Sequence, residues 1–223
     1  MADDLTQSVQ DYLKTLHHLG GDERRVSPME IAERLGVRAP SVTGMLKRLA
    51  EGGWIHYEPG RGAQLTSKGL REARRVVRRH RLVELFLHRI LGLDWSEVDA
   101  EAEILEHAIS PRLEEALARY LGEPLEDPHG HPIPTSEGEL ARRQLQPLGA
   151  FQPGQRIVIR EVRDDDPERL RRWKELGLTP GAVAHVLAYR SLDDVYELEV
   201  NGTIIRLGSE GLEGVSGEPG EQG

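Results

Sequence analysis

Six side chains that can bind a metal ion lie in two neighbouring segments that otherwise have the composition of buried helices. They are His80, Glu84, Asp99, Glu103, Glu106 and His107. On a helix, residues three, four and seven apart share a face, so His80 lies over Glu84 and the other four form one stripe. An inward-facing stripe of carboxylates repels itself unless a cation compensates it. The spacing therefore predicts a cation bound at these helices.

The types of donor atom narrow the choice of metal. Carboxylates and imidazoles without sulfur suit Mn(II), Fe(II) or other divalent first-row ions, and Ni, Co or Zn would also bind in vitro. The chain has no cysteine, which excludes disulfides, thiolate nucleophiles, Cys-based zinc fingers and iron–sulfur clusters. The alternative for these acids is a solvated helical face. Apolar neighbours such as Leu82, Phe86 and Ile104 favour packed helices instead.

The charge of the chain is unevenly distributed. The net charge is −9, yet residues 24–81 hold fourteen Lys and Arg against five Asp and Glu. Residues 82–147 reverse this balance, with five basic and fourteen acidic residues. Solvated helical faces would be the simpler explanation. The pattern indicates a polyanion-binding region followed by a cation-binding region.

The basic segment has the pattern of a winged helix-turn-helix. Helices are predicted over residues 4–20, 27–36 and 37–49, and WIHYEPGRGAQLTSKG predicts a β-hairpin that forms the wing. Two short helices across a Gly turn, followed by such a wing, are typical of DNA-binding domains. A three-helix core without a DNA role is the alternative. The residues predicted to contact DNA are Arg38, Pro40, Ser41, Thr43, Lys47 and Arg48 in the helix-turn-helix and Arg61 in the wing.

The rest of the chain predicts more helices and then a small β domain. A long helix over residues 67–91 begins with six basic residues suited to phosphates, namely Lys68, Arg71, Arg74, Arg75, Arg78 and Arg79. Helices over 96–109 and 111–121, a linker over 122–153 and alternating strands follow. The fold class is therefore mostly α with a small β domain. The predicted boundaries are 1–73 (winged helix), 74–150 (helical, with linker), 151–217 (β barrel) and 218–223 (disordered tail).

The location follows from what the sequence lacks. No stretch reaches the roughly 18 apolar residues that a membrane span needs, and the acidic start MADDLTQ is unlike a secretory signal. A cytoplasmic protein without membrane contact is expected.

Several short motifs, in order along nearly the whole chain, resemble the diphtheria toxin repressor family of metal-dependent regulators. They are DYL, IAERLGVRAPSVTGMLKRL, LTSKG, RRHRLVELFL, EAEILEHAIS and GHPIP, followed by a barrel similar to an SH3-like, FeoA-type domain. The resemblance implies a non-enzymatic homodimer that represses metal-homeostasis genes. Metal binding would make its winged helices competent for a palindromic double-stranded DNA operator.

The resemblance also implies two metal sites. Asp11 and Glu103 stand where iron-type members have Met and Cys, which is similar to the manganese-responsive branch. The implied primary site is Asp11, Glu103, Glu106 and His107. The implied ancillary site is His80, Glu84 and Asp99, with Asp166 or Glu168 added by the barrel. His129 and His131, in the linker, are a weak metal-binding pattern by themselves.

A mechanism and two rival functions follow from these predictions. Without metal, repelling carboxylates would let the first helix drift, and a cation would tie Asp11 to the central helices. The two recognition helices of the dimer would then lie about 34 Å apart, one turn of DNA. The rivals are a winged-helix regulator that senses an organic ligand and a metallohydrolase. The second needs an open, water-bearing metal site, and no HExxH signature is present.

Overall fold

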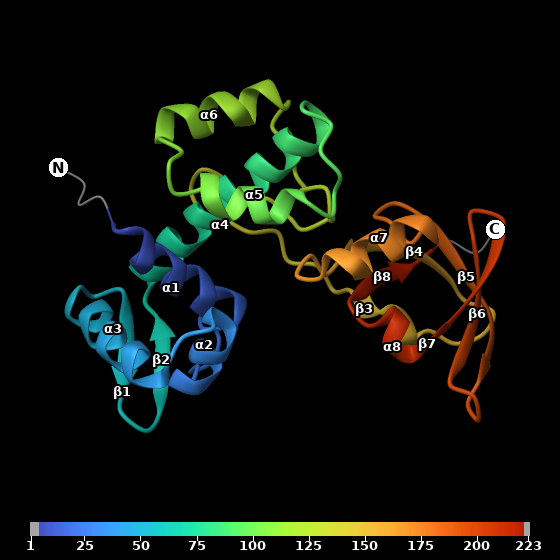
Figure 1. Ribbon diagram of the computed structural model, residues 1–223, viewed down its shortest axis with the longest axis horizontal. Helices are drawn as coiled ribbons and strands as arrows, with labels where there is room; N and C mark the ends of the chain where they lie inside the picture. Colours follow the sequence, from blue (N-terminus) through green and yellow to red (C-terminus); the bar gives the residue numbers. More distant parts are fainter. Residues whose placement is uncertain (1–4, 221–223) are drawn as a thin grey trace. The chain divides into compact units, whose positions relative to one another are not determined.

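The computed structural model describes residues 5–220, whose helices and strands are drawn in Figure 1. The chain divides into two compact units. Among the described residues, the first unit contains residues 5–80, 104–111 and 134–140. The second contains residues 81–103, 112–133 and 141–220. Within residues 5–220, no helix is both long enough and apolar enough to span a bilayer.

The first unit is a winged helix-turn-helix, as predicted. Its helices are α1 (Gln7–His18), α2 (Pro28–Leu35) and α3 (Ala39–Glu51), and the wing consists of β1 (Ile55–Glu58) and β2 (Gly62–Leu65). The two strands are antiparallel, with Ile55 opposite Leu65. Apolar residues at helical spacing, among them Leu13, Ile31 and Leu46, are fully buried in one core. This core holds the faces of the three helices against the wing.

Local signals fix the start and the end of α2. The Ser27 hydroxyl accepts a hydrogen bond from the Glu30 N–H, and the Glu30 carboxylate accepts one from the Ser27 N–H. This capping box satisfies donors that a helix start leaves unpaired. Gly36 ends the helix with φ +64°, a conformation that glycine adopts without strain. The tight turn between α2 and α3 is thus determined locally.

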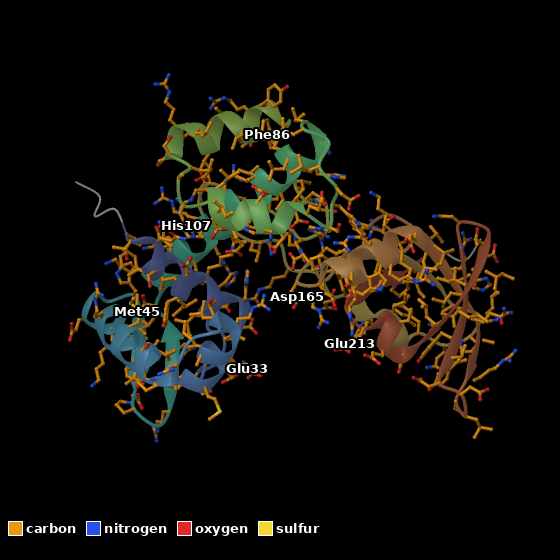
Figure 2. The ribbon with its side chains drawn as sticks, in the orientation of Figure 1. Glu33, Met45, Phe86, His107, Asp165 and Glu213 are labelled. Atoms are coloured by element: carbon orange, nitrogen blue, oxygen red, sulfur yellow. The ribbon has the colours of Figure 1, made fainter. Side chains whose placement is uncertain are left out.

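Three further helices follow the wing. They are α4 (Ser67–Arg89), α5 (Val98–Leu105) and α6 (Pro111–Tyr120). In the second unit, Leu82, Leu85 and Leu121 form a small core against which Phe86, labelled in Figure 2, also packs. The helix predicted over residues 96–109 is shorter in the structure, because α5 ends at Leu105. Glu106 and His107 therefore lie in the turn after this helix rather than on its face.

The predicted β domain is a six-stranded antiparallel sheet in the second unit. Its strands are β3 (Gln146–Pro147), β4 (Arg156–Val162), β5 (Val183–Arg190), β6 (Val195–Val200), β7 (Thr203–Gly208) and β8 (Val215–Pro219), in the order β3-β8-β4-β5-β6-β7. The connections include η1 (Leu148–Ala150), α7 (Pro167–Glu175) and α8 (Ser209–Leu212). Ile157, Trp173 and Leu198 are buried in its core.

The tail is more ordered than predicted. Residues 218 and 219, expected to begin a disordered end, belong to β8, which pairs with β4 through Val158 and Glu218. Glu218 also forms an ion pair with Arg160 across the two strands. Strand pairing and this ion pair order residues 218 and 219, although the Gly-rich composition had predicted disorder. Residues 221–223 lie outside the described residues.

Candidate metal centres

A first cluster of titratable side chains lies in the first unit, at the buried side of α1. It consists of Asp11, Lys14, His80, Glu106 and His107. Oδ1 of Asp11 lies 2.9 Å from Nε2 of His107, and Oε1 of Glu106 lies 3.4 Å from the same nitrogen. Residues of α1 thus meet residues almost a hundred positions later in the chain.

The ring of His107, labelled in Figure 2, is oriented by Gln10. Nδ1 of His107 lies 2.7 Å from Oε1 of Gln10. An amide oxygen only accepts hydrogen bonds, so Nδ1 donates to Gln10 and Nε2 is the ring nitrogen that faces the two carboxylates. In this position Nε2 can bind a cation together with the carboxylate oxygens. Such orientation through the second ring nitrogen is typical of histidines that bind metals.

Glu106 is fully buried and lies between two basic groups. Its Oε2 accepts a hydrogen bond from Nζ of Lys14 at 2.7 Å and lies 2.6 Å from Nδ1 of His80. Burial acts to raise the pKa of Glu106, but the bond to His80 and the charge of Lys14 outweigh burial and lower it. Glu106 is therefore ionised at neutral pH, and the site holds a buried carboxylate.

The first cluster fits a divalent cation by its chemistry. Donor atoms of Asp11, Glu106 and His107 all lie within 4.8 Å of one another. They offer carboxylate oxygen and imidazole nitrogen, the donor set that Mn(II) and Fe(II) accept. Because Asp11 belongs to α1, a cation held here would join that helix to the segment of Glu106.

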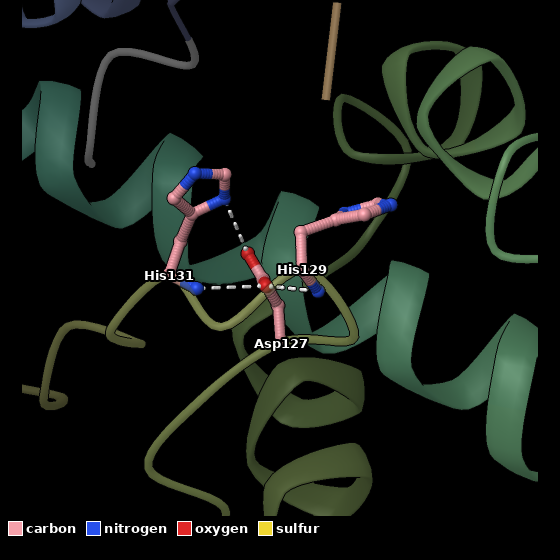
Figure 3. Close-up of side chains that lie close together, drawn as sticks. All are labelled: Asp127, His129 and His131. Carbon is pink, nitrogen blue, oxygen red and sulfur yellow. Dashed lines mark hydrogen bonds and ion pairs between the residues drawn. The ribbon is translucent and has the colours of Figure 1, made fainter. Parts of the chain in front are cut away.

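A second cluster lies in the second unit, where residues 127–131 meet α4 and the segment after β4. It consists of Glu84, Asp127, His129, His131 and Asp164. Figure 3 shows the Asp127 carboxylate accepting hydrogen bonds from the backbone N–H groups of His129 and His131, at 2.8 Å and 3.0 Å. Its other oxygen lies 3.3 Å from Nδ1 of His131 and 3.5 Å from Nε of Arg81. Asp127 thus shapes the turn that carries both histidines.

The ring of His129 points away from the Asp127 carboxylate (Figure 3), and the ring lies beside Glu84. Its Nε2 donates a hydrogen bond to the Trp95 carbonyl at 2.8 Å, so Nδ1 faces Oε1 of Glu84 at 3.4 Å. Burial acts to lower the pKa of His129, but the carboxylates of Glu84, Asp127 and Asp164 outweigh burial and raise it to about 9. Either a proton or a metal cation can supply the missing positive charge. Glu84, His129 and Asp164 therefore form a second set of candidate ligands.

Gly130 allows this turn to approach the sheet. It has φ +89°, and a Cβ atom at this position would lie 1.9 Å from the Arg160 carbonyl oxygen of β4. The His129 carbonyl accepts a hydrogen bond from the Val162 N–H at 2.9 Å. Only glycine fits both the conformation and the space. The HGH sequence is thus required by packing as well as by chemistry.

The structure places the other predicted ligands on separate elements. Asp166 caps α7, where its carboxylate accepts hydrogen bonds from the N–H groups of Glu168 and Arg169. Glu168 is exposed in the first turn of that helix. It is Asp164, two residues earlier, that joins the second cluster. Asp99 and Glu103 lie one turn apart on α5, and their roles stay predictions.

Sequence reasoning missed Gln10 and Lys14 in the first cluster and Asp127 and Asp164 in the second. Gln10 and Lys14 are four residues apart and buried on the apolar side of α1. Polar residues at core spacing are a signal that could have identified them. Asp127 alternates with the two histidines in the DPHGH sequence, which is a weaker signal. Asp164 has no local signal, since DDD offers three equivalent acids.

The predicted DNA-contacting residues lie on the recognition helix and the wing. Arg38, Pro40, Ser41, Lys47 and Arg48 are exposed on or just before α3. The side chain of Arg61, at the hairpin turn, is 76 % exposed and pairs with Glu58 at 3.3 Å. Thr43 is half-buried, and its hydroxyl donates to the Ala39 carbonyl at 3.3 Å.

Some of the basic residues of α4 donate hydrogen bonds to backbone carbonyls within the first unit. Arg78 is buried and donates to the Pro134 carbonyl at 2.6 Å, and Arg74 donates to the Gly138 carbonyl at 3.1 Å. Both bonds hold the segment 134–140 against α4 within the first unit. The prediction that all six basic residues present donors to phosphates is therefore wrong for Arg78, which is buried, and stays a prediction for the other five.

The winged helix and the two carboxylate–imidazole clusters define a DNA-binding regulator of the metal-dependent class. Three family models match the chain: the N-terminal DNA-binding domain of iron-dependent repressors over residues 4–63, their metal-binding and dimerisation domain over residues 66–135, and the FeoA domain over residues 146–219. The chain belongs to the diphtheria toxin repressor family of iron-dependent repressors.

Individual relatives agree with this assignment. The iron-dependent repressor IdeR of Mycobacterium leprae is 33% identical over 193 residues, which cover 80% of this chain and 83% of the relative. The diphtheria toxin repressor of Corynebacterium glutamicum is 30% identical over 197 residues, covering 82% and 85%. A solved manganese-dependent transcriptional repressor in complex with manganese is 35% identical, has a TM-score of 0.88 and covers 95% of this chain and 99% of its own.

Proposed function

We propose that this protein is a transcriptional repressor that senses Mn(II), Fe(II) or both and binds a palindromic operator as a homodimer. The observation that carries the proposal is the first cluster. It joins Asp11, on the first helix of the DNA-binding unit, to Glu106 and His107. A cation held there would act directly on the unit that presents α3.

The donor atoms support manganese or iron in preference to softer ions. Both clusters contain only oxygen and nitrogen donors, because the chain has no cysteine. Among solved relatives, one is in complex with manganese and ScaR is described with bound Zn2+ and with bound Cd2+. Other divalent ions are therefore expected to bind in vitro. Selectivity in the cell would depend on the supply of each metal.

The chain's own residues provide the coupling. Gln10 orients His107, and Asp11 places a carboxylate of α1 in the first cluster. The Glu106 carboxylate is already ionised when a metal binds. A bound divalent cation supplies the positive charge that offsets these carboxylates. To shift α1 and its unit from 1% to 99% of the DNA-competent state, metal must favour that state by about 5.5 kcal/mol. A set of charged oxygen and nitrogen ligands can provide this difference.

A homodimer is supported by exposed apolar residues in the helical part of the second unit. Leu91, Tyr120 and Leu125 are 57%, 68% and 79% exposed. Such side chains are typical of surfaces that a partner covers. The family description of residues 66–135 includes dimerisation, so a second copy of this chain is the proposed partner. An operator-binding dimer would act in the cytoplasm, where the DNA is.

The proposal is tested by selecting operators from a pool of random duplexes with the full-length protein. Parallel selections contain Mn(II), Fe(II) under anaerobic conditions, or a chelator, with metals at matched free concentrations. Metal-dependent enrichment of a palindrome is expected. Equal enrichment in the chelator would favour a winged-helix regulator that senses an organic ligand. No enrichment in any arm would contradict DNA binding altogether.

A further inference from the structure

We propose that Lys14 is a built-in counter-cation of the first cluster, which a divalent metal must displace from Glu106. The ammonium group would thereby raise the metal concentration at which the protein responds. This inference rests on the proposed function, since it concerns the same site. It deepens that function by assigning a regulatory role to a residue that is not a ligand.

The position of Lys14 is the first argument. Lys14 lies three residues after Asp11 on α1, so both side chains leave the helix on one side. Its side chain is only 7% exposed, although a lysine on a surface helix is normally solvated. Nζ donates to Oε2 of Glu106 at 2.7 Å and lies 3.1 Å from Nδ1 of His80. The ammonium group of Lys14 therefore contacts two of the side chains predicted to bind metal, Glu106 and His80.

The charge balance is the second argument. A fully buried carboxylate is costly unless a positive group lies beside it, and Lys14 supplies that group to Glu106. A divalent cation bound to Asp11, Glu106 and His107 would lie close to the same ammonium. Two like charges at such a distance in a buried site repel strongly. Metal binding and the Lys14–Glu106 contact therefore compete.

This competition changes the expected metal-free state. The carboxylates were expected to repel one another without metal and to release α1. Instead, Lys14 holds α1 to Glu106 through a single positive charge, across 92 residues of sequence. Metal would thus replace one tether by another that also engages Asp11 and His107. The lysine both orders the metal-free protein and weakens its affinity for metal.

The test compares full-length wild-type protein with Lys14→Met, which keeps an unbranched side chain only one atom shorter and removes its charge. Lys174→Met is the matched control, because it removes a lysine from an exposed ion pair with Asp94 in the second unit. Mn(II) binding is measured by calorimetry, and thermal unfolding is followed with a chelator and with Mn(II). We expect Lys14→Met to bind Mn(II) about tenfold or more tightly. Its metal-free form should melt several degrees lower, whereas Lys174→Met should bind Mn(II) like the wild type.

Each outcome decides the inference. Wild-type binding together with equal or weaker binding by Lys14→Met would overturn it and leave the proposed function intact. If neither protein binds Mn(II), the proposed function fails and the inference fails with it. If Lys14→Met does not fold without metal, Lys14→Gln is measured in the same way. Recovery of cooperative unfolding on adding Mn(II) would support Lys14 as the counter-cation that a metal replaces. No recovery in either variant would overturn the inference.

Discussion

Nδ1 of His129 lies 3.4 Å from Oε1 of Glu84, and both side chains are fully buried. The opposite ring nitrogen donates to the Trp95 carbonyl, which fixes the direction in which Nδ1 points. In the first cluster, Gln10 orients His107 toward Asp11 in the same manner. Both clusters thus combine an oriented imidazole with carboxylates, on separate units of the chain.

Glu84→Gln is expected to weaken Mn(II) binding at the second cluster by at least about tenfold, because it removes the charge and keeps the shape. Calorimetry should show fewer Mn(II) equivalents bound in the micromolar range, with binding at the first cluster retained. Glu115→Gln, which neutralises a carboxylate that is 68% exposed, is the control. An isotherm identical to that of the wild type would exclude Glu84 as a ligand.

His107→Ala is expected to abolish metal-stimulated operator binding and to leave the fold intact, because it removes the imidazole shared by Asp11 and Glu106. Gln10→Leu removes only the acceptor that orients the ring, so about a 10- to 100-fold loss in metal affinity is expected. Fluorescence anisotropy with labelled operator measures operator binding by His107→Ala, and calorimetry measures the metal affinity of Gln10→Leu. His185→Ala, in β5, is the control. Stimulation retained in His107→Ala would argue against the first cluster as the sensor.

Gly130→Ala is expected to displace the turn of residues 127–131, because its Cβ atom would overlap the Arg160 carbonyl. Gly154→Ala is a control with a similar backbone, since Gly154 has φ +91° and nothing lies within 4 Å of its added Cβ. Strain at positive φ should cost both variants about 1–2 kcal/mol of unfolding free energy. Only Gly130→Ala should also lose metal affinity at the second cluster. Equal behaviour in unfolding and calorimetry would show that the close approach is unimportant.

The capping box of α2 predicts a pH dependence of stability. The hydrogen bond from Arg24, with those from Ser27, lowers the pKa of Glu30 from 4.5 to about 2. A lowered pKa means that the ionised form is stabilised in the folded state. The contribution is therefore complete above about pH 4.5 and is lost as the pH falls through 2.

Glu30→Gln tests this dependence. It should lower the free energy of unfolding at pH 7 by about 1 kcal/mol, within the range of helix caps. The difference from the wild type should shrink toward pH 2, as measured by urea unfolding. Glu33→Gln, an exposed change in the same helix, is the control. A difference that stays constant with pH would contradict the role of the Glu30 charge.

The sequence by itself determined the winged helix and the β domain. Helical spacing of Leu13, Ile31 and Leu46, the Ser27–Glu30 cap and the Gly36 stop are local signals that act within a few residues. Alternation in segments such as RIVIREV predicted the strands of the sheet. The sequence also placed Glu106 and His107 beside Asp11, through resemblance to a known family, and the contacts agree.

Only the tertiary structure decided which charges meet. Lys14 and Glu106 are 92 residues apart, and no local pattern indicates that one neutralises the other. Asp164 could not be chosen over Asp166 from the sequence, because both lie in one acidic run and only the packing of β4 against the HGH turn separates their roles. Local signals arise from short-range backbone preferences, whereas the pairing of buried charges depends on how distant segments pack. The sequence therefore predicted acidic side chains whose negative charge a cation offsets. The fold determined that the ammonium group of Lys14 already supplies part of that positive charge.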